Sequence, residues 1–230
     1  MSESLEIRAV LVDMDGTVVD SHASVELYWS VVAQRYGLDV DEILAYCHGR
    51  PAADTMGRFA PHVAEEEWHG LHEELEAKAG DRRRLIKPIP GAARFLGQLV
   101  ESGVPWALVT SAPTHAARKH FVTCEFPWPE AVVSVEEITK GKPDPEGYLM
   151  AADMLEVSAD QTVVFEDAPA GIRAGVASGA KVIVVGSHPL DSLRLEEDEE
   201  MADSIVAQVP TLEAVSVEQT ETPEVFRLKW

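Results

Sequence analysis

A short apolar run that ends in two carboxylates constrains this chain more than any other feature. Residues 9–12 predict a buried β-strand, and Asp13 and Asp15 follow it with one residue between them, before Gly16 and Thr17. Like charges at the end of a buried strand repel each other, and a metal cation or a shared proton relieves that repulsion. An ordinary Asp-Gly turn with both carboxylates in solvent is the structural alternative. These residues alone leave both interpretations open.

The length and composition are those of a globular protein. A chain of 230 residues, 46% of them hydrophobic, can form one large domain or a core domain with a smaller inserted one. The formal net charge of −21 argues against nucleic acid or an anionic membrane as a partner. An anionic substrate therefore needs a local cluster of cations and backbone donors.

The two cysteines and the absence of targeting signals predict a cellular location. Cys47 and Cys124 lack the spacing of a metal site or a disulfide framework, so we expect buried thiols in a reducing compartment. No signal peptide and no run of membrane-spanning length are recognisable in the sequence. We expect a cytoplasmic protein that is a monomer or a weak dimer.

A long helical stretch follows the first strand. Helical patterns cover residues 22–36, 40–47, 51–60 and 64–79. No strand pattern appears between residues 20 and 84. We therefore expect a helical subdomain over residues 20–86, inserted into a core formed by residues 1–19 and 87–230.

From Gly91 onward, helices and strands alternate. Helices are expected over residues 91–102, 114–123, 144–155 and 169–178, and strands over residues 105–110, 131–134, 161–166 and 181–185. This alternation predicts an α/β fold, a Rossmann-like doubly wound parallel sheet with helices on both faces. We also expect a polar helix or loop over residues 191–204, a strand near 204–209 and a helix near 211–219.

Polar side chains follow the predicted strands of this sheet, where ligands bind in open parallel sheets. They are Asp13 and Asp15 after the first strand, Thr110 and Ser111 after the next, Lys142 in a later loop, and Glu166 and Asp167 at the end of the strand over residues 161–166. Carboxylate oxygens suit Mg²⁺, and the lysine and hydroxyl groups suit a phosphate. Each motif alone also fits a helix cap or a turn, but all of them in this order fit a metal and phosphate site better.

These motifs resemble the four motifs of the haloacid dehalogenase superfamily of phosphotransferases. The resemblance covers nearly the whole chain, and the helical insert lies where one branch carries its mobile cap. Residues 165–172 are similar to those of that branch's sugar-phosphate and glycerol-phosphate phosphatases. The resemblance implies a Mg²⁺-dependent phosphomonoesterase that acts on a small phosphorylated sugar or polyol through an aspartyl-phosphate.

The resemblance also implies catalytic roles. Asp13 is expected to be the nucleophile, and Asp15 the general acid/base that protonates the leaving alkoxide and then activates water. Thr110, a backbone amide near Ser111, and Lys142 are expected to hold the transferring phosphoryl group.

The same resemblance implies a metal site. Mg²⁺ is expected to be bound by Asp13, by the backbone carbonyl of Asp15 and by Asp167, with Glu166 acting through a water. In the expected cap, Arg50 could meet the substrate's phosphate or a hydroxyl, or it could pair with a surface acid.

Three other functions fit part of this pattern. A β-phosphoglucomutase-like mutase shares the four motifs, but such mutases carry a histidine in the first cap helix where this chain has Val25, with His22 nearby. A phospho-receiver domain is shorter and places its acidic pair before the phosphorylated aspartate. A binding protein without activity is disfavoured because no motif residue is missing. The sequence does not distinguish one sugar or polyol phosphate from another.

Overall fold

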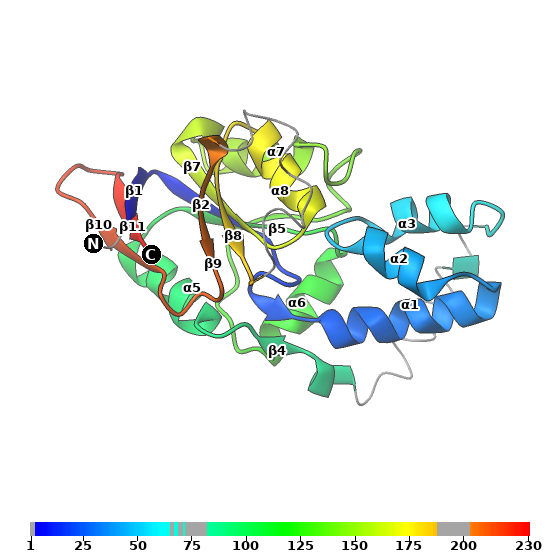
Figure 1. Cartoon of the computed structure of the whole chain (residues 1–230). Helices are drawn as coiled ribbons and strands as arrows, with labels where there is room; N and C mark the ends of the chain where they lie inside the picture. The colour runs from blue at the N-terminus through cyan, green and yellow to red at the C-terminus, as the bar shows by residue number, and fades with distance from the viewer. Residues whose placement is uncertain (1–2, 65–66, 69–70, 72–81, 188–202) are drawn as a thin grey trace.

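A six-stranded parallel sheet forms the centre of the fold in the computed structural model, which describes residues 3–64, 67–68, 71, 82–187 and 203–230 (Figure 1). Its strands are β2 (Ala9–Val12), β5 (Trp106–Val109), β6 (Ala131–Val133), β7 (Thr162–Glu166), β8 (Lys181–Val185) and β9 (Ile205–Val209). The order is β6-β5-β2-β7-β8-β9, and every neighbouring pair is parallel. The predicted doubly wound α/β fold is confirmed.

Helices cover both faces of this sheet. They are α5 (Ala92–Ser102), α6 (Thr114–Thr123), α7 (Glu146–Met154) and α8 (Pro169–Ala177), with a short 3₁₀ turn η2 (Ala159–Gln161) before β7. Alternate residues of β2 enter different apolar clusters: Val10 and Val12 pack with α5 and α6, and Leu11 packs with α7 and α8. Because both faces are buried, β2 carries no polar residue until it ends.

A group of helices is inserted between two short strands. β3 (Val19–Asp20) pairs antiparallel with β4 (Lys87–Pro88), and between them lie α1 (His22–Tyr36), α2 (Val40–Cys47), α3 (Ala52–Phe59) and the 3₁₀ turn η1 (Arg82–Leu85). Gly37 ends α1 with a φ of 69°, and the Asp39 side chain caps α2.

The inserted helices have an apolar cluster of their own, which includes Trp29, Ile43, Met56, Trp68 and Leu71. They lie beyond one end of the sheet in Figure 1. Most of the helix predicted over residues 64–79 lies outside the described residues. The division of the chain at residues 20 and 86 stays a prediction.

The helix expected near residues 211–219 is wrong. Residues 216–219 form strand β10 (Ser216–Gln219), which pairs with β11 (Phe226–Lys229), and β11 pairs with β1 (Ser4–Ile7) in a separate antiparallel sheet. Arg94 donates hydrogen bonds to the carbonyls of Leu212, Glu213 and Val215, which are therefore bound to a side chain of α5. Of the polar segment expected over residues 191–204, all but the last two residues lie outside the described part of the chain.

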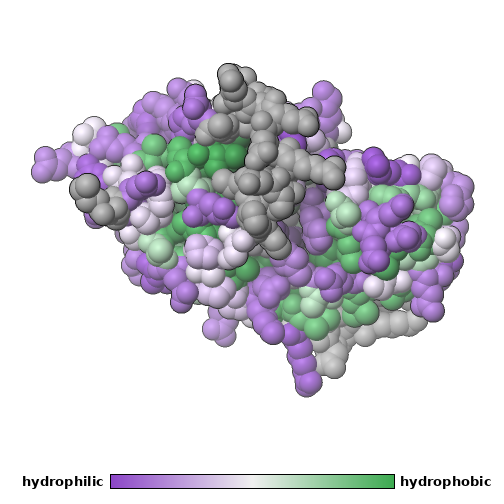
Figure 2. Space-filling model, in the orientation of Figure 1, coloured by the Kyte–Doolittle hydropathy of each residue, from purple (hydrophilic) through white to green (hydrophobic). Residues whose placement is uncertain are grey.

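The surface in Figure 2 is largely hydrophilic, with smaller apolar areas both on the part that holds the central sheet and on the inserted helices. This agrees with the excess of 40 acidic over 19 basic residues. None of the helices in the described ranges has the length and apolar character needed to cross a bilayer.

Candidate active site

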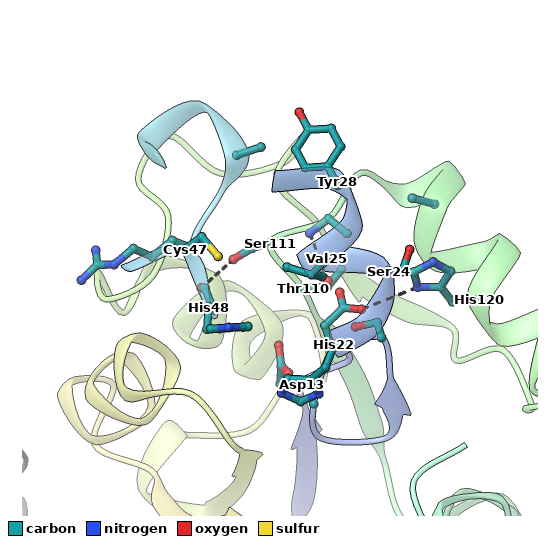
Figure 3. A pocket seen from close by; sticks show the side chains of 18 of the residues that line it. Asp13, His22, Ser24, Val25, Tyr28, Cys47, His48, Thr110, Ser111 and His120 are labelled. Carbon is teal, nitrogen blue, oxygen red and sulfur yellow. Dashed lines mark hydrogen bonds and ion pairs between the residues drawn. The ribbon is translucent and has the colours of Figure 1, made fainter. Parts of the chain in front are cut away.

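The carboxyl ends of three adjacent strands bring the predicted site residues together. β2 lies between β5 and β7, so Asp13 lies between the residues that end these neighbours. The Asp13 amide donates to the Phe165 carbonyl at 3.0 Å, and the Thr110 amide donates to the Val133 carbonyl at 2.9 Å. A pocket opens above this rim toward the inserted helices, and Asp13, Asp15, Thr110, Ser111 and Arg50 line it (Figure 3).

A buried lysine joins the two acidic motifs. The Lys142 ammonium lies 2.6 Å from Asp13 Oδ1 and 2.7 Å from Glu166 Oε1, and it donates to the Val109 carbonyl at 3.2 Å. Burial alone would lower the pKa of Lys142, but the charges of Asp13 and Glu166 raise it above its ordinary value. Lys142 therefore stays charged and offsets part of the negative charge around Asp13.

Glu166 is fixed by hydrogen bonds on both of its oxygens. Oε1 accepts from Lys142 and, at 2.9 Å, from the Tyr148 hydroxyl, while Oε2 accepts from the amides of Asp167 and Ala168 at 2.9 and 3.1 Å. A carboxylate has about four acceptor sites, so these bonds leave Glu166 little capacity for a metal. Its side chain anchors Lys142 and the turn into α8.

Sequence reasoning missed Tyr148. Its side chain is fully buried on α7, where it packs among the apolar residues of that face. A tyrosine in an apolar helical pattern gives no signal of a polar role, because its hydroxyl partner Glu166 lies 18 residues later on β7.

The acidic residues fit a divalent metal. Carboxylate oxygens of Asp13, Glu166 and Asp167 lie within 4.8 Å of one another. Burial and the charge of Glu166 raise the pKa of Asp13 to about 7, although Lys142 opposes the shift, and the same two causes raise the pKa of Asp167 well above its ordinary value. When ionised, these three carboxylates carry more negative charge than the single ammonium of Lys142 balances, and their oxygen-only chemistry suits Mg²⁺.

Two glycines allow the acidic residues to lie this close to the backbone. Gly16 has a φ of 89°, and a Cβ there would overlap the Asp167 carboxylate. A Cβ on Gly171 would overlap the carboxylate of Glu166. The Thr17 hydroxyl donates to Asp167 Oδ1 at 3.2 Å and orients that side chain.

Asp15 lies on the pocket side of the turn that follows β2, near a histidine that sequence reasoning missed. Its Oδ1 lies 3.6 Å from Nδ1 of His120, which extends from α6 (Figure 3). Burial would raise the pKa of Asp15, but the His120 imidazole and the Ser21 hydroxyl together lower it. His120 follows Thr110 by ten positions, and no motif marks it in the sequence.

The remaining predicted residues lie where the sheet meets the inserted helices. The Thr110 hydroxyl accepts from the Ala112 amide at 3.1 Å, and the Ser111 hydroxyl donates to the Gly49 carbonyl at 3.0 Å. The Arg50 guanidinium stacks 4.4 Å from the centre of the Tyr46 ring. Arg50 is thus held beside the pocket by an aromatic side chain of α2.

Residues 7–179 match the family of haloacid dehalogenase-like hydrolases. The chain belongs to this family. The expectation of an enzyme of the haloacid dehalogenase superfamily is confirmed.

Several curated relatives of this haloacid dehalogenase-like hydrolase are named as phosphatases. It is 38% identical to hexitol phosphatase A of Escherichia coli over 84% of this chain and 89% of the relative. It is 32% identical to glycerol-1-phosphate phosphohydrolase 1 of Saccharomyces cerevisiae over 83% of this chain and 80% of the relative. Both alignments include most of each protein, so the likeness is not confined to the motifs.

The fold is shared with solved structures of other proteins. The β-phosphoglucomutase of Clostridium difficile superposes with a TM-score of 0.74 at 20% identity, over 90% of this chain and 92% of that one. A hydrolase from Pseudomonas syringae superposes with a TM-score of 0.72 at 19% identity, over 89% and 94% of the two chains. At these identities the likeness concerns the fold alone.

Proposed function

We propose that this chain is a Mg²⁺-dependent phosphomonoesterase that hydrolyses a small phosphorylated sugar or polyol through an aspartyl-phosphate on Asp13. The observation that carries the proposal is the environment of Asp13. This carboxylate ends the central strand, contacts Lys142 at 2.6 Å, and lines a pocket that also holds Asp15. The hexitol and glycerol phosphates named for the relatives supply the substrate class.

The residues of the site can carry out two displacements. Asp13 attacks the phosphorus atom while the ester bond to the substrate's alcohol breaks, and the leaving alkoxide takes a proton from Asp15. Water then attacks the same phosphorus atom and gives its proton to Asp15. The bond between phosphorus and Asp13 breaks, which restores the carboxylate and releases phosphate.

Positive charge at the site allows the Asp13 carboxylate to approach the negatively charged phosphoryl group of the substrate. Lys142 stays charged beside Asp13, and the amides around Ser111 with the Thr110 hydroxyl offer donors to the phosphoryl oxygens. Asp13, Asp167 and the carbonyl of Asp15 would hold Mg²⁺, which when bound supplies the further positive charge that this chemistry needs.

The inserted helices offer groups that could select the substrate. Arg50, stacked on Tyr46, lines the pocket opposite the carboxyl end of β2, where a phosphate or a hydroxyl of the substrate would lie. We propose a small phosphorylated metabolite as the partner, with no nucleic acid and no membrane, and a monomer or weak dimer. The buried free thiols of Cys47 and Cys124 support a reducing compartment such as the cytoplasm.

A screen of phosphorylated metabolites tests this function. The purified protein with Mg²⁺ is incubated with hexitol, hexose and glycerol phosphates, and with nucleotides and a phosphotyrosine peptide as unrelated esters. We expect phosphate release from the small sugar or polyol esters, and none from any ester with Asp13→Asn. Preference for the nucleotides or the peptide, or equal release by Asp13→Asn, would contradict the proposal.

A further inference from the structure

His120 lies outside the four motifs but contacts the proposed acid/base. Its Nδ1 and Oδ1 of Asp15 are 3.6 Å apart, and both atoms are withdrawn from solvent. Within the described residues, neither atom has a partner at hydrogen-bond distance. A small movement of either side chain would shorten this separation to that of a hydrogen bond, which both buried atoms otherwise lack.

The core holds in place the helix that carries His120. His120 belongs to α6, whose Ala117 and Phe121 are buried in the apolar cluster beneath the sheet. Phe121 packs edge-to-face on Phe126 and Trp128, with ring centres 5.4 and 5.3 Å away. Phe121, which follows His120 directly, is thus packed on several sides, and neither of these aromatic partners belongs to the inserted helices.

We propose that His120 is a positioning residue that orients the carboxylate of Asp15 from the core. The proposal rests on the proposed function, in which Asp15 acts twice. Ser21, just before α1, is a second group that lowers the pKa of this carboxylate, and it lies on the side of the inserted helices. His120 contacts the Asp15 carboxylate from α6, which belongs to the core. The carboxylate therefore keeps its orientation after the alcohol has left and the inserted helices have moved away from the core.

This arrangement favours hydrolysis. The second displacement needs Asp15 to accept a proton from water when no sugar is bound. A carboxylate oriented by a core helix is ready for that step without substrate. One oriented by the insert alone would be ready only while the substrate kept the insert closed.

Isosteric substitutions separate positioning from packing. The side-chain nitrogen of asparagine occupies the place of histidine Nδ1, whereas that of glutamine extends toward Nε2. We expect His120→Ala to lower kcat by about 10–100-fold with KM changed little, because part of the acid/base contribution is lost. His120→Asn should recover most of that loss and His120→Gln less of it. His115→Ala, on the same helix but exposed, is the matched control and should retain wild-type kinetics.

A measurement without substrate keeps the test separate from the proposed function. In ¹⁵N NMR spectra of the full chain, Asp15→Ala should shift the His120 Nδ1 resonance and leave the His115 resonances unchanged. An unshifted His120 resonance would overturn the contact. A rise in KM at constant kcat for His120→Ala would overturn the positioning role and make His120 a substrate-binding residue. A wild-type protein inactive on every sugar and polyol phosphate would count against the proposed function, while the NMR result would still decide the contact.

Discussion

Lys142 and Asp13 form a buried ion pair with 2.6 Å between Nζ and Oδ1, although they are 129 positions apart in the sequence. The same ammonium contacts Glu166 at 2.7 Å, so one cation lies between two carboxylates. Removing it leaves two buried like charges close together, which is costly for the fold as well as for the chemistry.

Lys142→Met should therefore destabilise the metal-free protein by about 3–5 kcal/mol, because both carboxylates lose their buried partner. Urea denaturation measures the change in the free energy of unfolding. The double variant Asp13→Asn/Lys142→Met should lose less stability than the two single changes added together. Strict additivity would show that the pair does not interact. Lys140→Met is the matched control, since Lys140 is 72% exposed and should change stability by at most about 0.5 kcal/mol.

Asp13→Asn should fold and lose phosphatase activity by at least about 10³-fold, because an amide does not attack phosphorus. Phosphate release and circular dichroism measure the two effects, and mass spectrometry excludes deamidation back to aspartate. The exposed Asp153→Asn on α7 is the control and should keep full activity. Substantial turnover by an undeamidated Asp13→Asn protein would remove Asp13 as the nucleophile.

Most of the site residues predicted from the sequence lie next to strands, although Lys142 and Arg50 lie in loops. Asp13, Thr110 and Glu166 each follow a run of buried residues, so an open parallel sheet places them on one rim. His120 and Tyr148 reach the same site from the middle of helices, where position depends on helix rotation and packing. The sequence carries no local mark of that orientation.

The fold was predictable in its centre and not at its C-terminal end. Strands β2, β5 and β6 of the central sheet are continuous apolar runs, while β10 has only Val217 buried among polar residues. Its partner β11 pairs in turn with β1, more than 200 positions earlier, as in the pair Leu5 and Leu228. Short strands of this kind are stabilised by pairing partners that local periodicity does not reveal.

Removal of the metal should abolish activity. Because the acidic cluster offers oxygen ligands only, Mg²⁺ should restore the chelated and dialysed enzyme, whereas Zn²⁺, which favours nitrogen and sulfur, should restore much less. Phosphate release in metal-free buffer with each ion added back measures this. Full activity after exhaustive chelation would contradict the metal requirement.

Proton binding at Asp13 should oppose metal binding. Burial and Glu166 raise the pKa of Asp13 from 3.8 to about 7 in the metal-free fold, so the folded state binds this proton more tightly than the unfolded state does. Its contribution to metal-free stability is therefore present below the ordinary pKa of 3.8 and is lost as the pH rises through about 7.

The rise in melting temperature caused by Mg²⁺ should accordingly be larger above the raised pKa of Asp13 than well below it, since the proton no longer competes. Differential scanning calorimetry with and without Mg²⁺, at one pH on each side of that pKa, measures the difference. Asp13→Asn should show a weaker pH dependence. An equal effect of Mg²⁺ at both pH values would contradict the link between the proton and the metal.

Val25 bears on the choice between a hydrolase and a mutase. It lines the pocket on α1 (Figure 3), at the position where the resemblance leads us to expect a histidine in a mutase. A mutase must shield the aspartyl-phosphate from water until a second hydroxyl of the sugar takes the phosphoryl group. A valine offers no hydrogen bond that would link the position of Asp15 to a bound sugar, so water should reach the intermediate as soon as the first alcohol leaves.

We therefore expect free phosphate to accumulate in proportion to the substrate consumed, with no isomeric sugar phosphate at any time. Phosphorus NMR of a reaction with glucose 1-phosphate or a hexose 6-phosphate follows the substrate, both isomers and free phosphate in one sample. Asp13→Asn in the same tube format gives the uncatalysed background. If an isomerised ester appeared before or faster than free phosphate, the aspartyl-phosphate would be transferring to sugar, and the enzyme would be a mutase despite Val25.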